Sequence, residues 1–469
     1  MPPPRRGARR RTAAAASTKS PHATRASRRL SVQHGEPFKR DSRGSAAAAT
    51  AGDDDGMPLS DEILLLVFSA LSATIGDLVR CAATCRRWRR LVSADAAFIC
   101  RHAPPCSDPF VRTLALGFFD SRTNGVAPTR FVSLPSAGSR LQPSFAALVD
   151  GASRVVASRN GHLVLDLRRR ANSRITHTVR LGVCNPVTAD GSVDVLPLLR
   201  GKESPTGPYA CTVITAADEY GSDRHAPRSQ HASYRVLLLY NRRSFTALRC
   251  YSSSAGSWGP EAVVTGARIG RNQLAGELHA VVVRYGVVFW PRLAMSVRLD
   301  SLLQPAPVAS VANNNGNAQS RHTVAGFSLA VGQRLISSQR RLLGVTPDGR
   351  MLRVDADSET IRVYCGGDAD GDGDDISCAR LTGESLEWKW TMKQGLMRVH
   401  TVRLRWLCEK SGLVIFTARN GHDPDTHVYT IDIEKKQFRR VATCSEPASL
   451  GEMCGYEMDR VTLLASLGR

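Results

Sequence analysis

Residues 58–98 read PLSDEILLLVFSALSATIGDLVRCAATCRRWRRLVSADAAF. Apolar residues recur there at intervals of three and four, the spacing of one face of an α-helix, in three short groups. The groups are Ile63, Leu64, Val67, Phe68 and Leu71, then Leu78, Val79 and Ala82, then Cys85, Trp88, Leu91 and Val92. The pattern predicts three short helices within residues 57–100.

The residues around these groups support the helical interpretation. Ser60 suits an N-cap, and Asp61 and Glu62 fall in the first turn, where carboxylates oppose the helix dipole. Gly76 interrupts the pattern between the first two groups. Because a domain of about forty residues buries a small fraction of its surface, we expect a partner to complete it.

The order of these residues resembles an F-box. Leu59-Ser60 stands where the family usually has Leu-Pro, and Thr84-Cys85-Arg86-Arg87-Trp88 is a close variant of its third-helix pattern. The resemblance implies docking onto a Skp-type adaptor and, through it, onto a cullin ubiquitin ligase, with Trp88 as the principal anchor. The expected adaptor-binding residues, shared with the domain's own core, are Leu59, Ile63, Leu64, Val67, Leu71, Leu78, Trp88 and Leu91. The alternative is an ordinary helical subdomain of a larger enzyme.

Composition narrows the class of protein. With 469 residues and 42% hydrophobic content, the chain has room for more than one folded domain. Its longest apolar run, Ile63 to Leu71, is far shorter than the roughly 18–20 residues of a membrane span. We find no secretory signal and no Asn-x-Ser/Thr acceptor. These features predict a soluble protein of the nucleus, the cytoplasm or both, with no membrane partner.

The net charge of +21 is unevenly distributed. Residues 1–43 hold twelve Lys or Arg and two acids, so nearly half the excess lies in a predicted disordered tail, residues 1–56. The run Arg5-Arg6-Gly7-Ala8-Arg9-Arg10-Arg11 suits a nuclear address, a polyanion contact or an organelle transit peptide, and equally a plain solvated tail. The remaining charge is dispersed, which argues against a dedicated nucleic-acid site.

The sequence predicts no catalytic residue, no metal ligand and no cofactor. Its twelve cysteines include no C-x-x-C pair, and no Walker A, Gly-x-Ser-x-Gly or Gly-x-Gly-x-x-Gly motif occurs. Asp368 to Asp375 resembles the start of an EF-hand loop, but Ala379 stands where the bidentate Glu belongs. We therefore interpret that stretch as a solvated acidic loop, and the turn containing His422 and His427 as a surface loop.

After a connector at residues 101–110, residues 111–465 change to short β-rich runs. Asn160-Gly161 is a strong hairpin signal between Arg154–Ser158 and His162–Leu167, because both turn positions accept positive φ. Further expected strands are Val183–Val187, Val193–Leu196, Tyr234–Tyr240, Phe245–Tyr251, His279–Val283, Val287–Trp290, Leu342–Val345, Met351–Val354, Ile361–Tyr364, Val402–Leu407, Leu413–Thr417 and Val428–Ile433.

This run of hairpins favours an α+β multidomain chain: a three-helix F-box followed by a mainly β, propeller-like domain. Phrases such as Val183-Cys184-Asn185-Pro186-Val187-Thr188 resemble the C-terminal domains of plant, particularly grass, F-box proteins. The resemblance implies a non-catalytic substrate receptor of a Skp–cullin–F-box ligase, whose β domain binds an unknown protein target. The alternatives are a non-degradative F-box scaffold and a propeller enzyme with a fortuitous helical segment.

Overall fold

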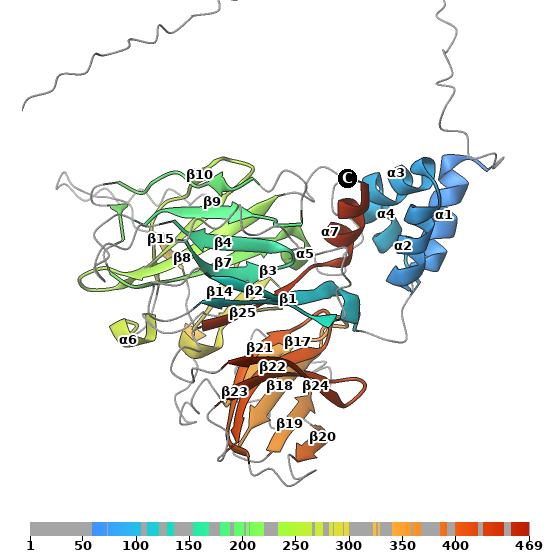
Figure 1. Ribbon diagram of the computed structural model, residues 1–469. Coiled ribbons are helices and arrows are strands. Elements are labelled where there is room, and N and C mark those ends of the chain that lie inside the picture. Colours follow the sequence, from blue (N-terminus) through green and yellow to red (C-terminus); the bar gives the residue numbers. More distant parts are fainter. Residues whose placement is uncertain are drawn as a thin grey trace, which may run out of the picture. The chain divides into compact units, whose positions relative to one another are not determined.

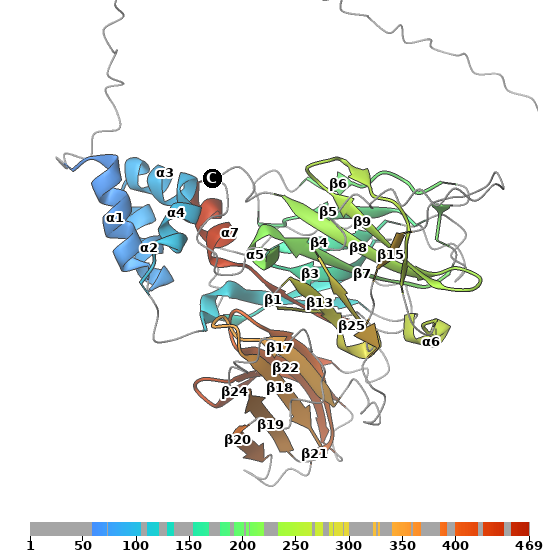
Figure 2. The ribbon, with the colours of Figure 1, turned by 180° about the vertical axis from the view of Figure 1, so that it is seen from behind.

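A computed structural model gives the three-dimensional structure of the chain (Figures 1 and 2). It describes residues 59–468 apart from 73, 105–109, 122–128, 136–152, 168–178, 188–191, 201–202, 206, 220–232, 265–267, 275–280, 285, 294, 300–321, 325–326, 329–339, 358–359, 367–384, 392–398, 421–424 and 445–451. The expected tail at residues 1–56, the expected acidic loop Asp368–Asp375, and His422 lie outside the described residues.

The expected helices are present, and a short fourth helix follows them. They are α1 (Asp61–Leu71), α2 (Ile75–Thr84), α3 (Arg86–Ala94) and α4 (Ala96–Arg101). Ser60 is confirmed as the N-cap of α1, with its side chain accepting a hydrogen bond from the Ile63 backbone N–H. Periodicity did not separate α4 from α3, because Asp95 alone stands between them.

A segment from the far end of the chain completes the core of these helices. That core contains Leu64, Phe68, Leu78, Ala82, Leu91, Val92, Ala96, Ile99 and Leu464, all buried. Leu464 belongs to α7 (Arg460–Ala465), which is followed by the 3-10 helix η11 (Ser466–Gly468). The end of the expected β-rich region, residues 460–465, is thus helical, and it contacts α2, α3 and α4.

The rest of the described chain is mostly antiparallel β-sheet. The first sheet, in the order β2-β1-β25, joins β1 (Ala115–Ser121) and β2 (Arg130–Ser133) to β25 (Glu452–Glu457) near the end of the chain. The second sheet contains β3 (Arg154–Arg159), β4 (His162–Asp166), β5 (Leu181–Cys184) and β6 (Asp194–Val195). The third contains β7 (Tyr209–Thr215), β8 (Tyr234–Asn241), β9 (Thr246–Ser252), β10 (Ser257–Trp258), β11 (Ala262–Val264) and β15 (His322–Val324).

Three further sheets have four strands each. The fourth is formed by β12 (Val282–Arg284), β13 (Val287–Trp290), β14 (Met295–Arg298) and β16 (Phe327–Ser328). The fifth is formed by β17 (Arg341–Val345), β18 (Met351–Ala356), β19 (Thr360–Cys365) and β20 (Ser385–Thr391). The sixth is formed by β21 (Val399–Cys408), β22 (Leu413–Asn420), β23 (Thr426–Asp432) and β24 (Gln437–Cys444). Short connecting helices are η1 (Arg112–Leu114), α5 (Ala216–Glu219), α6 (Arg271–Leu274) and η7 (Pro291–Leu293).

Each sheet contacts the next, and the last contacts the first. Strand β25 contacts β3 and β21, β3 contacts β7, and β17 contacts both β12 and β21. The third and fourth sheets share a hydrophobic core that includes Leu237, Val288 and Trp290. A second core joins the first, second and sixth sheets through Phe119, Leu165 and Ile415.

The hairpin signals were accurate where they could be compared with the structure. Asn160 and Gly161 both have positive φ, 46° and 82°, and join β3 to β4 as expected. The expected strands on either side of Tyr285-Gly286 and of Pro347-Asp348-Gly349 also pair. The sequence analysis did not predict several elements: strands β1, β2, β7, β10, β11, β14, β15, β16, β20 and β25, and helix α7.

Candidate functional site

Helix α1 presents an uncovered apolar surface. Ile63, Leu66, Val67 and Leu71 are 47%, 58%, 42% and 39% exposed, and their spacing places them along one side of the helix. We call these four residues the α1 apolar face. The other side of α1 buries Leu64 and Phe68 in the helical core.

The structure divides the eight expected adaptor-binding residues into three groups. Ile63, Val67 and Leu71 belong to the α1 apolar face. Leu64, Leu78 and Leu91 are buried in the helical core, and Leu59 and Trp88 are partly buried against it. Sequence reasoning missed Leu66, the most exposed of the four, because the run Leu64-Leu65-Leu66 does not reveal which leucine points outward.

Interactions between α1 and α3 hold the exposed surface in place. Arg87 of α3 donates through Nε to Asp61 Oδ1 at 2.9 Å and through Nη2 to the Leu59 carbonyl at 2.6 Å. The rings of Phe68 and Trp88 meet edge to face, with centroids 5.4 Å apart. Asp61, expected to favour the helix dipole, therefore also anchors α3 to the start of α1.

Helix α7 joins the helical core to the β region. Asp459 caps it, accepting from the Thr462 N–H at 2.7 Å and the Thr462 hydroxyl at 2.8 Å. Its adjacent residues Leu463 and Leu464 are buried in different cores, Leu463 with the sheets and Leu464 with α1–α4. Since α7 begins three residues after β25 ends, one continuous segment of the chain belongs to both regions.

These features define a small helical domain with an uncovered apolar surface, attached to a large, mostly β region. Residues 61–101 match the F-box-like family. This match supports the interpretation of the chain as an F-box protein. Proteins of that family are in general non-catalytic receptor subunits that bind a Skp-type adaptor in a cullin complex.

Other comparisons add little. No curated protein matches the chain. A protein from Lactobacillus plantarum aligns with 73% of this chain and 99% of its own at 8% identity and a TM-score of 0.33. A functionally unknown protein from Desulfotomaculum acetoxidans aligns with 74% of this chain and 100% of its own, at 11% identity and a TM-score of 0.33. A post-proline cleaving enzyme from Rickettsia typhi aligns with 63% of this chain and 37% of its own, at 6% identity and a TM-score of 0.27. Likenesses this low carry no argument.

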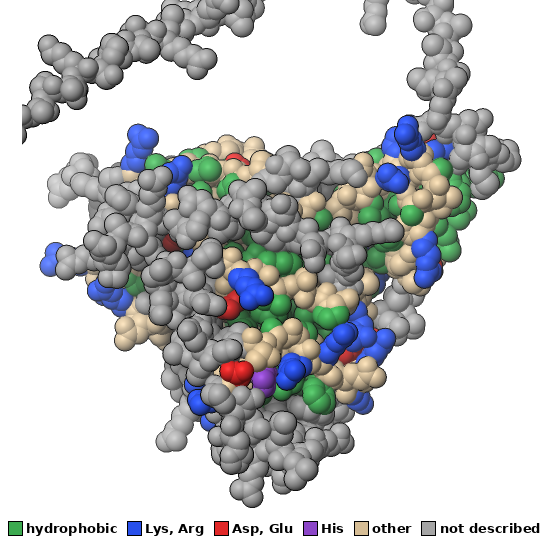
Figure 3. Space-filling model, viewed as in Figure 1, with side chains coloured by type: hydrophobic (Ala, Val, Ile, Leu, Met, Phe, Trp, Pro, Cys, Tyr) green, Lys and Arg blue, Asp and Glu red, His purple; other side chains and the backbone are tan. Residues whose placement is uncertain are grey.

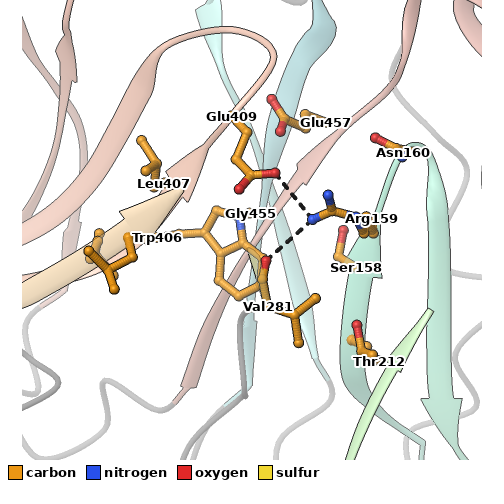
Figure 4. Close-up of a pocket in the computed structure, with 13 residues that line it drawn as sticks. Ser158, Arg159, Asn160, Thr212, Val281, Trp406, Leu407, Glu409, Gly455 and Glu457 are labelled. Atoms are coloured by element: carbon orange, nitrogen blue, oxygen red, sulfur yellow. Dashed lines mark hydrogen bonds and ion pairs between the residues drawn. The ribbon is translucent and has the colours of Figure 1, made fainter. Parts of the chain in front are cut away.

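A second candidate site is a small cavity among the sheets (Figure 4). Its volume is about 40 Å³, and residues of β3, β7, β17, β21 and β25 line it. That volume suits a few water molecules. Arg159 projects into it, pairing with Glu409 at 3.2 Å and donating to the Val281 carbonyl at 3.3 Å.

The charged groups around this cavity satisfy one another. Arg159 also pairs with buried Asp218 at 2.7 Å, and Asn160 donates to the same carboxylate at 3.0 Å. Burial acts to raise the pKa of Asp218, but the charge of Arg159 outweighs it, so this pKa is lowered. The network ties β3 to α5 and to Glu409, the residue that follows β21, so it helps to hold neighbouring sheets together.

Glu457, which also lines the cavity, is a carboxyl whose environment favours the neutral form. Burial, and then the nearby Glu409, raise its pKa from 4.5 to about 7, although backbone N–H groups of Lys410 and Ser411 donate to it.

Among the described residues, no group of three or more His, Cys, Asp or Glu side chains is placed to hold a metal ion. None of the described helices has the length and hydropathy needed to cross a membrane.

We expect Glu457→Gln to stabilise the fold more at about pH 8 than at about pH 5. A carboxyl whose pKa is raised from 4.5 to about 7 supports the fold fully below about pH 4.5 and loses that contribution as pH rises through 7. Glutamine mimics the neutral form, so its advantage should grow towards about 3 kcal/mol at the higher pH. Urea unfolding at both pH values measures the difference in free energy of unfolding between the variant and the parent chain. The control is Glu434→Gln, which lies on an exposed turn. An equal effect at both pH values would contradict the assignment.

Proposed function

We propose that this chain is the substrate-receptor subunit of a Skp–cullin–F-box ubiquitin ligase. The observation that carries the proposal is the α1 apolar face, which lies on the domain that matches the F-box-like family. Among the described residues, seven large apolar side chains are exposed and four of them are on this one helix. Such a concentration is typical of a surface that a partner covers.

The adaptor would contact α1 from its solvent side. The partly buried Leu59 and Trp88 would support this surface from within the helical core, together with Leu64, Leu78 and Leu91. An assembly of this kind typically buries about 1,600 Å² in total, so the four exposed side chains would form the centre of a larger contact.

We further propose that the six sheets are the blades of a β-propeller that binds the target protein. The unbroken series of contacts from the first sheet to the sixth and back supports this arrangement, as does the pairing of β1 with β25. As part of this proposal, the β region is similar to the C-terminal domains of grass F-box proteins, and the protein acts in the nucleus or the cytoplasm. The receptor would contribute proximity between target and ubiquitin-loaded enzyme.

Co-purification tests the proposal. The tagged chain, co-expressed with a Skp-type adaptor, should form a complex that survives size-exclusion chromatography and that recruits a cullin. A folded chain that elutes apart from the adaptor would overturn it. Target proteins found by affinity purification should accumulate when the proteasome is inhibited; stable bound proteins would instead favour a scaffold.

A further inference from the structure

Strand β24 is the outer edge of the sixth sheet. It pairs with β23 on one side and with no described strand on the other. Residues 434–440, from the preceding turn into the strand, are all exposed. Alternate backbone N–H and C=O groups of an edge strand point away from its sheet and are available to another strand.

A row of aromatic rings reaches the surface at this edge. Buried Phe416 stacks on Tyr429 with ring centroids 5.3 Å apart, and Tyr429 lies 6.2 Å from Phe438. Phe438 itself is 47% exposed. The edge therefore offers an apolar contact backed by packed rings.

Four cations surround this aromatic side chain in sequence: Lys435, Lys436, Arg439 and Arg440. None of their side chains has a hydrogen bond or ion pair with any described residue, and Glu434 is the single acid within residues 434–440. Lys and Arg side chains lie beside exposed hydrophobic ones over the region of β24 (Figure 3). The surface is complementary to an acidic partner.

We propose that β24 binds an acidic, extended peptide segment of another protein as an added strand. Backbone pairing along the open edge would supply affinity, Phe438 an apolar contact, and the four cations the preference for acidic sequence. A nucleic acid would satisfy the cations but could not pair with the backbone edge. Charged residues on an edge strand also discourage aggregation, but that role does not require an exposed phenylalanine.

Fluorescence anisotropy with the full chain tests the proposal. The probe is a labelled peptide of about nine residues with the repeat Glu-Glu-Val, compared with Lys-Lys-Val and with a single-stranded oligonucleotide. We expect binding of the acidic peptide, and a loss of affinity of about tenfold or more when Arg439 and Arg440 are both changed to Glu.

Matched variants separate this from general charge effects. Arg243→Glu with Arg271→Glu changes the net charge equally at two exposed positions, in the turn between β8 and β9 and at the start of α6, and should leave affinity within about twofold. Phe438→Ser should weaken peptide binding several-fold, with circular dichroism confirming that each variant is folded. The proposal is overturned by absent peptide binding, by equal losses in both charge variants, or by oligonucleotide binding as tight as the peptide's and insensitive to Phe438. These measurements need no adaptor, so they are independent of the ligase proposal.

Discussion

We expect that changing Leu66 and Val67 together to aspartate will abolish co-purification with a Skp-type adaptor and leave the chain folded. Both side chains are exposed, 58% and 42%, so the isolated protein loses little when they become polar. In the complex the new carboxylates would be buried without partners, and each would cost several kcal/mol. Truncating a hot-spot residue of an interface costs about 2 kcal/mol or more, roughly thirtyfold in affinity.

The control for this variant is a chemically identical change elsewhere. Val195 and Leu198 are exposed apolar residues of the β region, so Val195→Asp with Leu198→Asp should bind the adaptor like the parent chain. Size-exclusion chromatography of the co-expressed proteins measures both. Retained adaptor binding by the folded Leu66–Val67 variant would refute the docking surface.

Trp88 and Leu91 are less informative targets, although the sequence singles out Trp88. Trp88 packs edge to face on Phe68, and Leu91 is buried in the helical core. Removing both side chains would disturb the core itself, so lost adaptor binding would not separate docking from folding.

Leu464→Asp should destabilise the F-box-like helices, although it lies more than 360 residues after them in the chain. The Leu464 side chain is fully buried among α1–α4. Truncating a core leucine to alanine costs about 2–5 kcal/mol, and a buried unpaired carboxylate adds to that cost. Hydrogen exchange in α1–α4 should rise strongly, and adaptor binding should fall with it.

Ala465→Asp is the matched control, because Ala465 is exposed on the same helix. It should leave hydrogen exchange in α1–α4 and adaptor binding unchanged. If Leu464→Asp behaves like this control, the C-terminal helix is dispensable and the helical domain is autonomous.

Local signals in the sequence predicted the local structure. Apolar spacing located the three main helices, and Asn160-Gly161 located a hairpin because both residues adopt positive φ. Periodicity could not separate the α1 apolar face from the core, because the exposed and the buried positions of α1 are both occupied by apolar residues. Leu66 was missed for that reason.

Long-range structure left weaker signals. Strand β25 reads EMCGYE, which lacks an alternating pattern, and its partner β1 is more than 330 residues away. Helix α7 has six residues, too few for periodicity to distinguish it from a turn. The cavity network around Arg159 unites residues from four distant segments, and no local motif encodes it.

The pairing of β1 with β25, followed at once by α7, has a genetic consequence. An autonomous adaptor-binding domain released by a premature stop codon would compete with other receptors and act dominantly. Here the helices near the start of the chain need Leu464 to complete their core, and the first sheet needs its last strand. On the proposed function, nonsense alleles that end before β25 should therefore be recessive, because the shortened chain would lack the Leu464 side chain that packs in the helical core.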